Sequence, residues 1–424
     1  MRFLQIHKII DSLIVFMLIM STGGLLFVFN RNMMYILFIS LIIFALLFTY
    51  KSIKKNLFYS FITTWVLLIV LFLINYYFAF SSQDQNKYQY YLFIITLSIL
   101  VLFHFSNNRI DDVFVKRLYF VLKLIVFHAF IQVFFYLIVK DNLNPISSSE
   151  YECRTFNYMF YYASLDFKSH SVVSLFGIEI VRNQGLFWEA GVAQVFFNIL
   201  FFLEAFIVKK NRVILLITAI VIITTYSTIG IAILLLQVII YFIAELKKNL
   251  IFIPIGLILL IPVYSLFTAN VEEKLYGEKE ASFQKRYFDL VQPLFIGLES
   301  PLTGIGLDLN RFQEYRSEFY INSTTFNLIQ EQVGLDLKME NTNQGSANSF
   351  MFLLAAMGFP TTLIFIYMLL NQQLINKRKR IFLSIVILSL FSSPLLLRPF
   401  FLIFIISGFT HYFHRVISHK QQLA

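Results

Sequence analysis

Two charged residues, Arg182 and Glu189, flank the start of one long apolar run of this chain. An arginine offers a planar fork that can pair two oxygens of an anion, and a glutamate can accept a proton from a hydroxyl group. Arg182 lies just before the run, and Glu189 lies about one turn inside it. Because ionisable groups within a membrane are costly, they indicate function by default. The structural alternative makes Trp188 an interface anchor, with Glu189 extending its carboxylate toward water.

The elements that would position these residues are transmembrane helices. Of the 424 residues, 58% are hydrophobic and 14% are charged, against roughly 25% charged in soluble domains. Apolar runs of about 20 residues, rather than alternating segments of about ten, favour helices over a membrane barrel. The one cysteine, Cys153, excludes an intrachain disulfide framework and cysteine-based metal sites. The sequence therefore predicts an all-α, polytopic membrane protein with about 12 spans.

The predicted spans cover residues 9–29, 33–50, 57–80, 88–106, 118–139, 186–208, 213–227, 229–244, 250–269, 348–370, 381–396 and 399–414. The seventh and eighth come from one apolar run of 32 residues, which is too long for a single upright span of about 20. Hydroxyl groups and Gly230 at residues 224–230 favour a turn between two short helices.

Five consecutive regions follow from this pattern. They are a five-span region (residues 1–139), a first long outer loop (140–185), a four-span region (186–269), a second long outer loop (270–347), and three spans with a cytoplasmic tail (348–424). Both loops are expected to contain short helices. In the second loop, apolar residues recur at helical spacing between Phe283 and Phe295, which predicts a solvated helical lid on the outer membrane surface.

The distribution of basic residues predicts the orientation. With a cytoplasmic N-terminus, the inner segments carry 19 Lys and Arg residues, and the short outer loops carry only Arg31, Lys87 and Arg398. The positive-inside rule then places both termini in the cytoplasm and both long loops outside. Topology thus accounts for most of the net charge of +10, and we expect no nucleic-acid partner.

Several segments in the second half of the chain carry a family resemblance. They are residues 182–191, 226–230, Arg286, 301–306 and 348–358. In their order, their spacing and the long outer loop among them, they resemble the O-antigen polymerase and ligase superfamily, the Wzy and WaaL proteins of bacterial surface-polysaccharide assembly. Ligases of that superfamily commonly have a histidine directly before the asparagine of the last motif. Here that position is Ala347, and His170 lies elsewhere, so the resemblance favours the polymerase.

The resemblance implies a glycosyltransferase in the bacterial cytoplasmic (inner) membrane, active on its outer face. Such a polymerase transfers a growing glycan from undecaprenyl diphosphate to the terminal, non-reducing-end sugar of a new undecaprenyl-diphosphate-linked oligosaccharide repeat unit. Its partners are these repeat units, membrane lipid and a chain-length regulator protein. The outer loops show no Asp-x-Asp or similar carboxylate pair, so we expect chemistry without a metal ion or other cofactor.

The resemblance also assigns roles to three charged residues. Arg182 and Arg286 would stabilise the departing diphosphate, since arginine pairs two phosphate oxygens at once. Glu189 would accept the proton of the acceptor hydroxyl, with a pKa raised by partial burial. Two alternatives stay open: Glu189 holds Arg182 in place, and Arg286 is an ordinary partner of Asp289.

The remaining candidates are polar residues around the last outer loop. Asn348 and Ser346 would bind sugar hydroxyls, and Arg398 would supply a third cation. For Asn348, helix N-capping is an equally good interpretation. Gly304 and Gly306 are expected to form a tight turn.

Two other functions compete with the polymerase. An O-antigen ligase, which attaches glycan to the lipid A core, is mechanistically close. A polysaccharide flippase or transporter should show internal repeats, but the loop-poor first half of this chain does not resemble the second.

Overall fold

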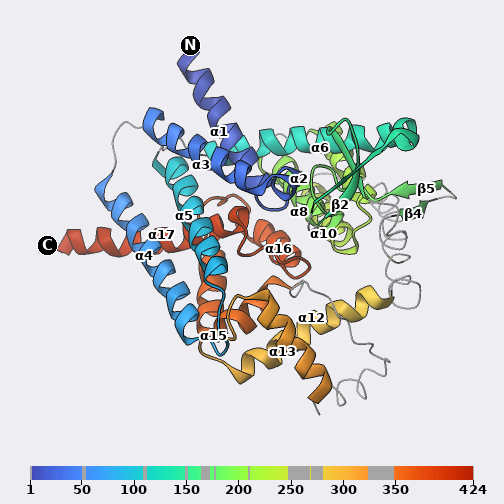
Figure 1. Ribbon diagram of the computed structural model, residues 1–424. Coiled ribbons are helices and arrows are strands. Elements are labelled where there is room, and N and C mark those ends of the chain that lie inside the picture. The colour runs from blue at the N-terminus through green and yellow to red at the C-terminus, as the bar shows by residue number, and fades with distance from the viewer. Residues whose placement is uncertain are drawn as a thin grey trace. The chain divides into compact units, whose positions relative to one another are not determined.

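The computed structural model describes residues 2–49, 54–107, 112–148, 151–163, 172–175, 178–208, 211–246, 268, 280–322 and 348–423 (Figure 1). The chain divides into two compact units that interleave along the sequence. Unit 1 comprises residues 1–49, 110–280 and 375–389, and unit 2 comprises residues 50–109, 281–374 and 390–424.

Unit 1 combines helices with two small sheets. Its helices are α1 (Arg2–Met20), α2 (Leu25–Phe29), α3 (Arg31–Thr49), α6 (Val113–Val139), the 3₁₀ turn η1 (Lys140–Asn142), α8 (Ala190–Phe202), the π-helical turn η3 (Leu203–Ile207), α9 (Arg212–Thr224), α10 (Thr228–Leu246) and α16 (Lys379–Leu390). Helix α6 packs against α1, α8 and α9, and α8 also packs against α10. Unit 1 therefore has its core along α8, where nearly every residue is buried.

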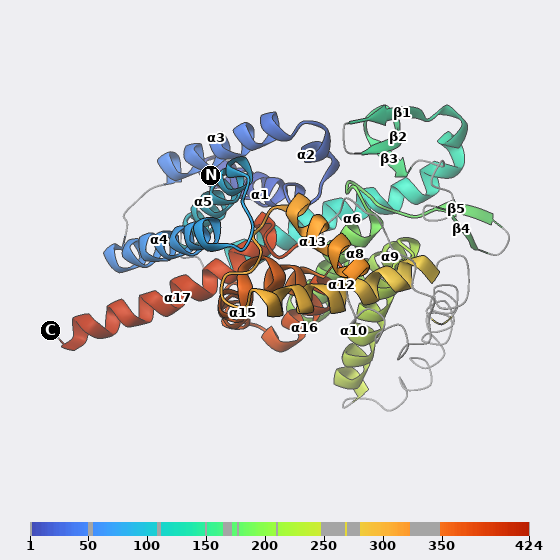
Figure 2. The same cartoon turned by 60° about the horizontal axis from the view of Figure 1, so that its bottom comes forward.

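The described residues of the first long loop form mainly β-structure, and among them only η1 matches the prediction of short helices. Strands β1 (Asn144–Ser147), β2 (Glu152–Phe156) and β3 (Phe160–Ala163) form an antiparallel sheet, and β4 (Val172–Leu175) pairs with β5 (Ile178–Val181) (Figure 2). In β2, Cys153 and Thr155 face inward while their neighbours face out. This alternation buries one face of a strand and could not bury a stripe along a helix.

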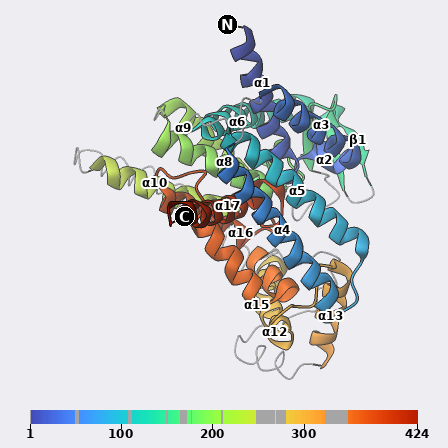
Figure 3. The ribbon, with the colours of Figure 1, turned by 90° about the vertical axis from the view of Figure 1, so that its left-hand side faces the viewer.

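Unit 2 is a bundle of helices. Its members are α4 (Lys55–Phe78), α5 (Gln85–Asn107), α12 (Glu280–Glu299), α13 (Leu309–Asn322), α15 (Ser349–Leu370) and α17 (Pro399–Leu423). Helices α4 and α5 lie side by side (Figure 3), and α17 packs against α4, α5 and α15. The helical prediction for the start of the second loop is confirmed by α12, whereas its role as a lid stays a prediction.

Within the described ranges, seven helices are long and apolar enough to cross a membrane: Arg31–Phe48, Lys55–Phe78, Gln85–Ser106, Val113–Asn142, Ala190–Ile207, Ser349–Leu370 and Pro399–His419. Each coincides with a predicted span. Large apolar side chains remain exposed along these helices, for example Leu47 at 73%, as expected where lipid covers them. The all-α, polytopic class is therefore confirmed.

The other predicted spans have separate outcomes. The first is divided between α1 and α2 at residues 21–24, and α16 has only 12 residues. The break within the 32-residue run is confirmed, because α9 and α10 are separate helices on either side of residues 225–227, where Tyr226 has a φ of 49°. The predicted span 250–269 falls almost entirely outside the described residues.

Candidate functional site

The segment that carries Arg182 is anchored inside unit 1 by hydrogen bonds to backbone carbonyls. The backbone N–H of Asn183 donates to the carbonyl of Thr224 at 2.9 Å, and its side-chain amide donates to the carbonyl of Ala129 at 3.1 Å. The guanidinium Nε of Arg182 donates to the carbonyl of Thr225 at 3.0 Å. The turn between α9 and α10 thereby fixes one edge of the Arg182 guanidinium, and the side chain stays partly exposed.

The next residues pair with the α1–α2 linker and delay the start of α8. After Gly185, whose φ is 55°, the carbonyl of Leu186 accepts from the N–H of Leu25 at 2.9 Å. The N–H of Trp188 donates to the carbonyl of Gly23 at 3.0 Å. Because these residues form an extended pairing, α8 begins only at Ala190.

Glu189 is the N-cap residue of α8, so it does not lie one turn inside a helix as the sequence predicts. Its side chain makes no capping hydrogen bond and is exposed, so the partial burial expected from the sequence is absent. The carboxylate lies over the first turn of α8, since a Cβ at Gly191 would be 2.9 Å from Oε1. A helix N-terminus favours negative charge there.

An aromatic cluster supports this segment from the first long loop. Tyr151 donates its hydroxyl to Oε1 of Gln184 at 3.1 Å, and its ring lies 6.3 Å from that of Phe29. Burial raises the pKa of Tyr151, and nearby Cys153 and Glu189 raise it further, whereas the hydrogen bond to Gln184 lowers it. At neutral pH Tyr151 is therefore a neutral hydroxyl near Glu189.

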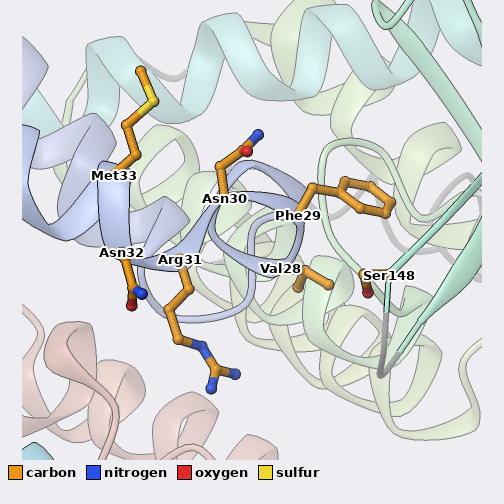
Figure 4. Close-up of a pocket in the computed structure, with 7 residues that line it drawn as sticks. All are labelled: Val28, Phe29, Asn30, Arg31, Asn32, Met33 and Ser148. Carbon is orange, nitrogen blue, oxygen red and sulfur yellow. The ribbon is translucent and has the colours of Figure 1, made fainter.

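A surface hollow of about 520 Å³ lies beside this cluster. Val28, Phe29, Asn30, Arg31, Asn32, Met33 and Ser148 line it (Figure 4). Ser148 comes from the first long loop, and the other lining residues come from the α2–α3 junction, where Arg31 and Asn32 point away from Met33. None of the predicted site residues lines the hollow.

In unit 2, Asn348 is the N-cap residue of α15. Its side-chain oxygen accepts from the N–H groups of Phe350 (3.1 Å) and Met351 (3.2 Å). The capping interpretation of Asn348 is therefore confirmed, and its role in sugar binding stays a prediction. Ser346, the other predicted sugar-binding residue, lies outside the described residues.

Ser349 connects this helix start to the turn before Arg398. Its hydroxyl donates to the carbonyl of Ser393 at 2.5 Å and accepts from the N–H groups of Leu395 and Leu396. The exposed Arg398 follows two residues later, immediately before α17. The structure thus brings Asn348 and Arg398 to the same end of unit 2.

Arg286 lies on α12, in a part of that helix whose side chains are not described. Asp289, three residues later, is buried. The choice between a substrate-binding Arg286 and a simple partner of Asp289 therefore stays open. Across the described ranges, no group of three or more His, Cys, Asp or Glu side chains gathers where a metal ion could bind.

The turn predicted at Gly304 and Gly306 is present, with φ values of 70° and 100°. It lies against Gly358, where α15 is broken (φ 76°, ψ 171°). Sequence reasoning missed the residues that hold this turn, which come from the α4–α5 hairpin: Asn75, Ser81, Gln83, Lys87 and Tyr88. The one available signal was the lone amide of Asn75 within an apolar span.

Residues 213–366 match the family model described as O-antigen ligase. This match covers about a third of the chain and includes α12, the glycine turn and the start of α15. Arg182, Glu189 and Arg398 lie outside it. No curated protein matches the chain. Together with the membrane-spanning helices, the match supports an enzyme of the membrane that processes lipid-linked glycan.

Proposed function

We propose that the protein polymerises oligosaccharide repeat units linked to undecaprenyl diphosphate, on the outer face of the bacterial cytoplasmic membrane. The observation that carries the proposal is Arg182, a partly exposed arginine fixed by Thr225 and close in sequence to the exposed Glu189. An arginine held on one edge loses little freedom when it binds a phosphate group, so it is pre-organised for an anionic leaving group.

The reaction is a displacement at the anomeric carbon of the donor glycan. The acceptor hydroxyl forms the new C–O bond, and the bond between that carbon and the phosphate oxygen breaks. The diphosphate departs with the electron pair, and Arg182 stabilises its charge. Glu189 accepts the hydroxyl proton. Arg286 is proposed as a second phosphate ligand, and Asn348 and Arg398 as groups that bind the substrate.

An O-antigen ligase is the second candidate, because the matching family model carries that description. Its transfer step is the same, but the acceptor is lipid A core. Ligases of the superfamily that this chain resembles commonly have a histidine at the position of Ala347. The alanine therefore favours the polymerase over the ligase.

The test uses full-length protein reconstituted with undecaprenyl-diphosphate-linked repeat units as the only substrate, in the presence of EDTA. A polymerase yields a ladder of longer glycans on the carrier lipid, and the Arg182→Ala variant yields none. Product that forms only after lipid A core is added would replace the polymerase with the ligase. Activity that requires added Mg²⁺ or Mn²⁺ would contradict the metal-independent mechanism.

A further inference from the structure

Asn75 is a buried polar side chain of unit 2 whose amide nitrogen and oxygen are both hydrogen-bonded. It lies near the end of α4 and is only 3% exposed. Its amide nitrogen donates to the carbonyls of Thr303 (2.5 Å) and Ala356 (2.8 Å), and its oxygen accepts from the hydroxyl of Tyr88. One side chain therefore joins four segments of the chain.

The rest of the α4–α5 hairpin extends this contact along the glycine turn. Tyr88 accepts from the N–H of Leu307 at 3.1 Å. Gln83 donates to the carbonyl of Ile305 at 2.8 Å and accepts from the N–H of Asp308 at 3.2 Å. Lys87 pairs with the Asp308 carboxylate at the end of the turn. The hairpin side chains thus contact both the backbone of the turn and the Asp308 side chain.

The glycine turn supplies hydrogen-bond donors to the broken helix α15. The break at Gly358 leaves the carbonyls of Ala355 and Ala356 without donors from their own helix. The N–H groups of Ile305 and Gly306 supply them, each at 2.9 Å. The hairpin therefore fixes the break through the turn, and Asn75 also does so directly.

Two helices that carry proposed substrate-binding residues end at this cluster. The first half of α15 runs from Asn348 to the break, a distance of about 13 Å for nine helical residues. Helix α12, which carries Arg286, ends next to Ser300, whose carbonyl accepts from the N–H of Gly304 at 2.9 Å. Gly297 on α12 also packs closely against α15.

We propose that Asn75, Gln83 and Tyr88 are positioning residues for the glycan transfer reaction. They set the direction of the first half of α15 and of α12, and thereby the positions of Asn348 and Arg286. This inference rests on the proposed function and deepens it. All three residues lie outside the segment that matches the O-antigen ligase model, so the α4–α5 hairpin supplies a part of the working enzyme that the matched segment lacks.

The test compares Asn75→Leu and Tyr88→Phe with Thr64→Val in the full-length protein. Thr64 is a matched control because it is buried on the same helix and donates only within it, to the carbonyl of Ser60. Since misplacement of catalytic groups by about 1 Å can cost about 10²-fold in rate, we expect Asn75→Leu and Tyr88→Phe to lower kcat by about 10- to 100-fold. Because Asn348 is proposed to bind the substrate, KM should rise in the same two variants, and Thr64→Val should leave both constants unchanged.

Hydrogen exchange and kcat per folded molecule distinguish a loss of positioning from a loss of folding. The comparison holds whether the enzyme is a polymerase or a ligase. Hydrogen exchange should become faster at Ile305, Gly306 and Leu307 in the two hairpin variants and stay unchanged in Thr64→Val. Normal kcat per folded molecule in both hairpin variants would overturn the proposal, even if their melting temperatures fall. If the wild-type enzyme proves to be a ligase, the same comparison applies to ligation, so failure of the polymerase proposal is distinguishable from failure of this one.

Discussion

The residue types of Glu189 and Arg182 were sufficient to select them as candidates, but not to predict their surroundings. Both could be selected from the sequence because ionisable groups at membrane depth are costly and indicate function by default. The partner of Arg182 could not, since Thr225 is 43 residues away and contributes only a backbone carbonyl. The exposure of Glu189 was also unpredictable, because it depends on the pairing of the preceding residues, Leu186 and Trp188, with the α1–α2 linker.

Replacement of Glu189 by glutamine tests its role as the proton acceptor. Glutamine keeps the size of the side chain but cannot accept the proton, so turnover should fall by about 10²–10⁴-fold. The exposed Glu299 provides the control, and Glu299→Gln should keep normal turnover in the reconstituted assay. Normal turnover in Glu189→Gln would leave Glu189 only a structural or positioning role.

Cys153 should be inert in the folded protein. It is fully buried, and burial, aided by nearby Glu152, raises the pKa of its thiol to about 12. Its thiolate fraction at pH 8 is then only about 10⁻⁴, against roughly a quarter for a free thiol. A maleimide should label the native protein slowly and the denatured protein rapidly, as mass spectrometry can follow. Equal labelling rates would contradict the packing around β2.

Among the elements, α9, α10 and α12 were predictable because apolar length and helical spacing are local signals. The strands of the first loop were not, since they are four or five residues long, and the buried residues of β2 and β3 contact α2 and the end of α6. Helices α4 and α5 were predicted as spans, but their contacts with the glycine turn were missed. These contacts join residues more than 200 positions apart in the sequence, which give no local signal.

The break in α15 predicts the effect of a substitution at Gly358 on stability. At Gly358 a side chain would face a φ of 76° and would lie 2.5 Å from the carbonyl of Leu302. Gly358→Ala should therefore lower the free energy of unfolding by at least about 1–3 kcal/mol, measured by thermal unfolding in detergent. Gly191→Ala is the control, because it meets only the flexible side chain of Glu189. Equal stability of the two variants would mean that the break is not fixed by the turn.

At the scale of the molecule, hydropathy was sufficient to predict a multi-pass helical protein, and the charge count predicts its orientation. Hydropathy could not predict that the chain folds as two interleaved units, because that depends on which helices pack together. Nor could it predict that, within unit 2, Ser349 brings Asn348 and Arg398 to the same end.

Orientation can be tested with single cysteines. Met159 is 62% exposed in the first long loop, and Lys54 is exposed just before α4. Since the positive-inside rule places the loop outside, Met159→Cys should react with an impermeant reagent in intact spheroplasts, and Lys54→Cys should react only after lysis. The buried Cys153 should give little background. The opposite pattern would place the candidate site in the cytoplasm.

Arginine-to-lysine substitution tests most directly whether an arginine fork stabilises the departing diphosphate of a polymerase. Arg182→Lys and Arg286→Lys keep the charge but lose the fork, so each should reduce turnover by about 10²–10³-fold. Arg311→Lys is the control, because Arg311 is partly exposed, its carboxylate partner is Glu314 on the same helix, and its hydrogen bond to another described segment goes to the Ser82 hydroxyl.

The measurement is the length distribution of surface glycan in cells that carry each variant as the sole copy. Arg182→Lys and Arg286→Lys should yield glycan with a single repeat unit, with the variant proteins still in the membrane, whereas Arg311→Lys should yield the normal distribution. Normal long glycan from both test variants would contradict the role of the arginines. Loss of all glycan from lipid A, with long polymer left on the carrier lipid, would contradict the polymerase and identify a ligase.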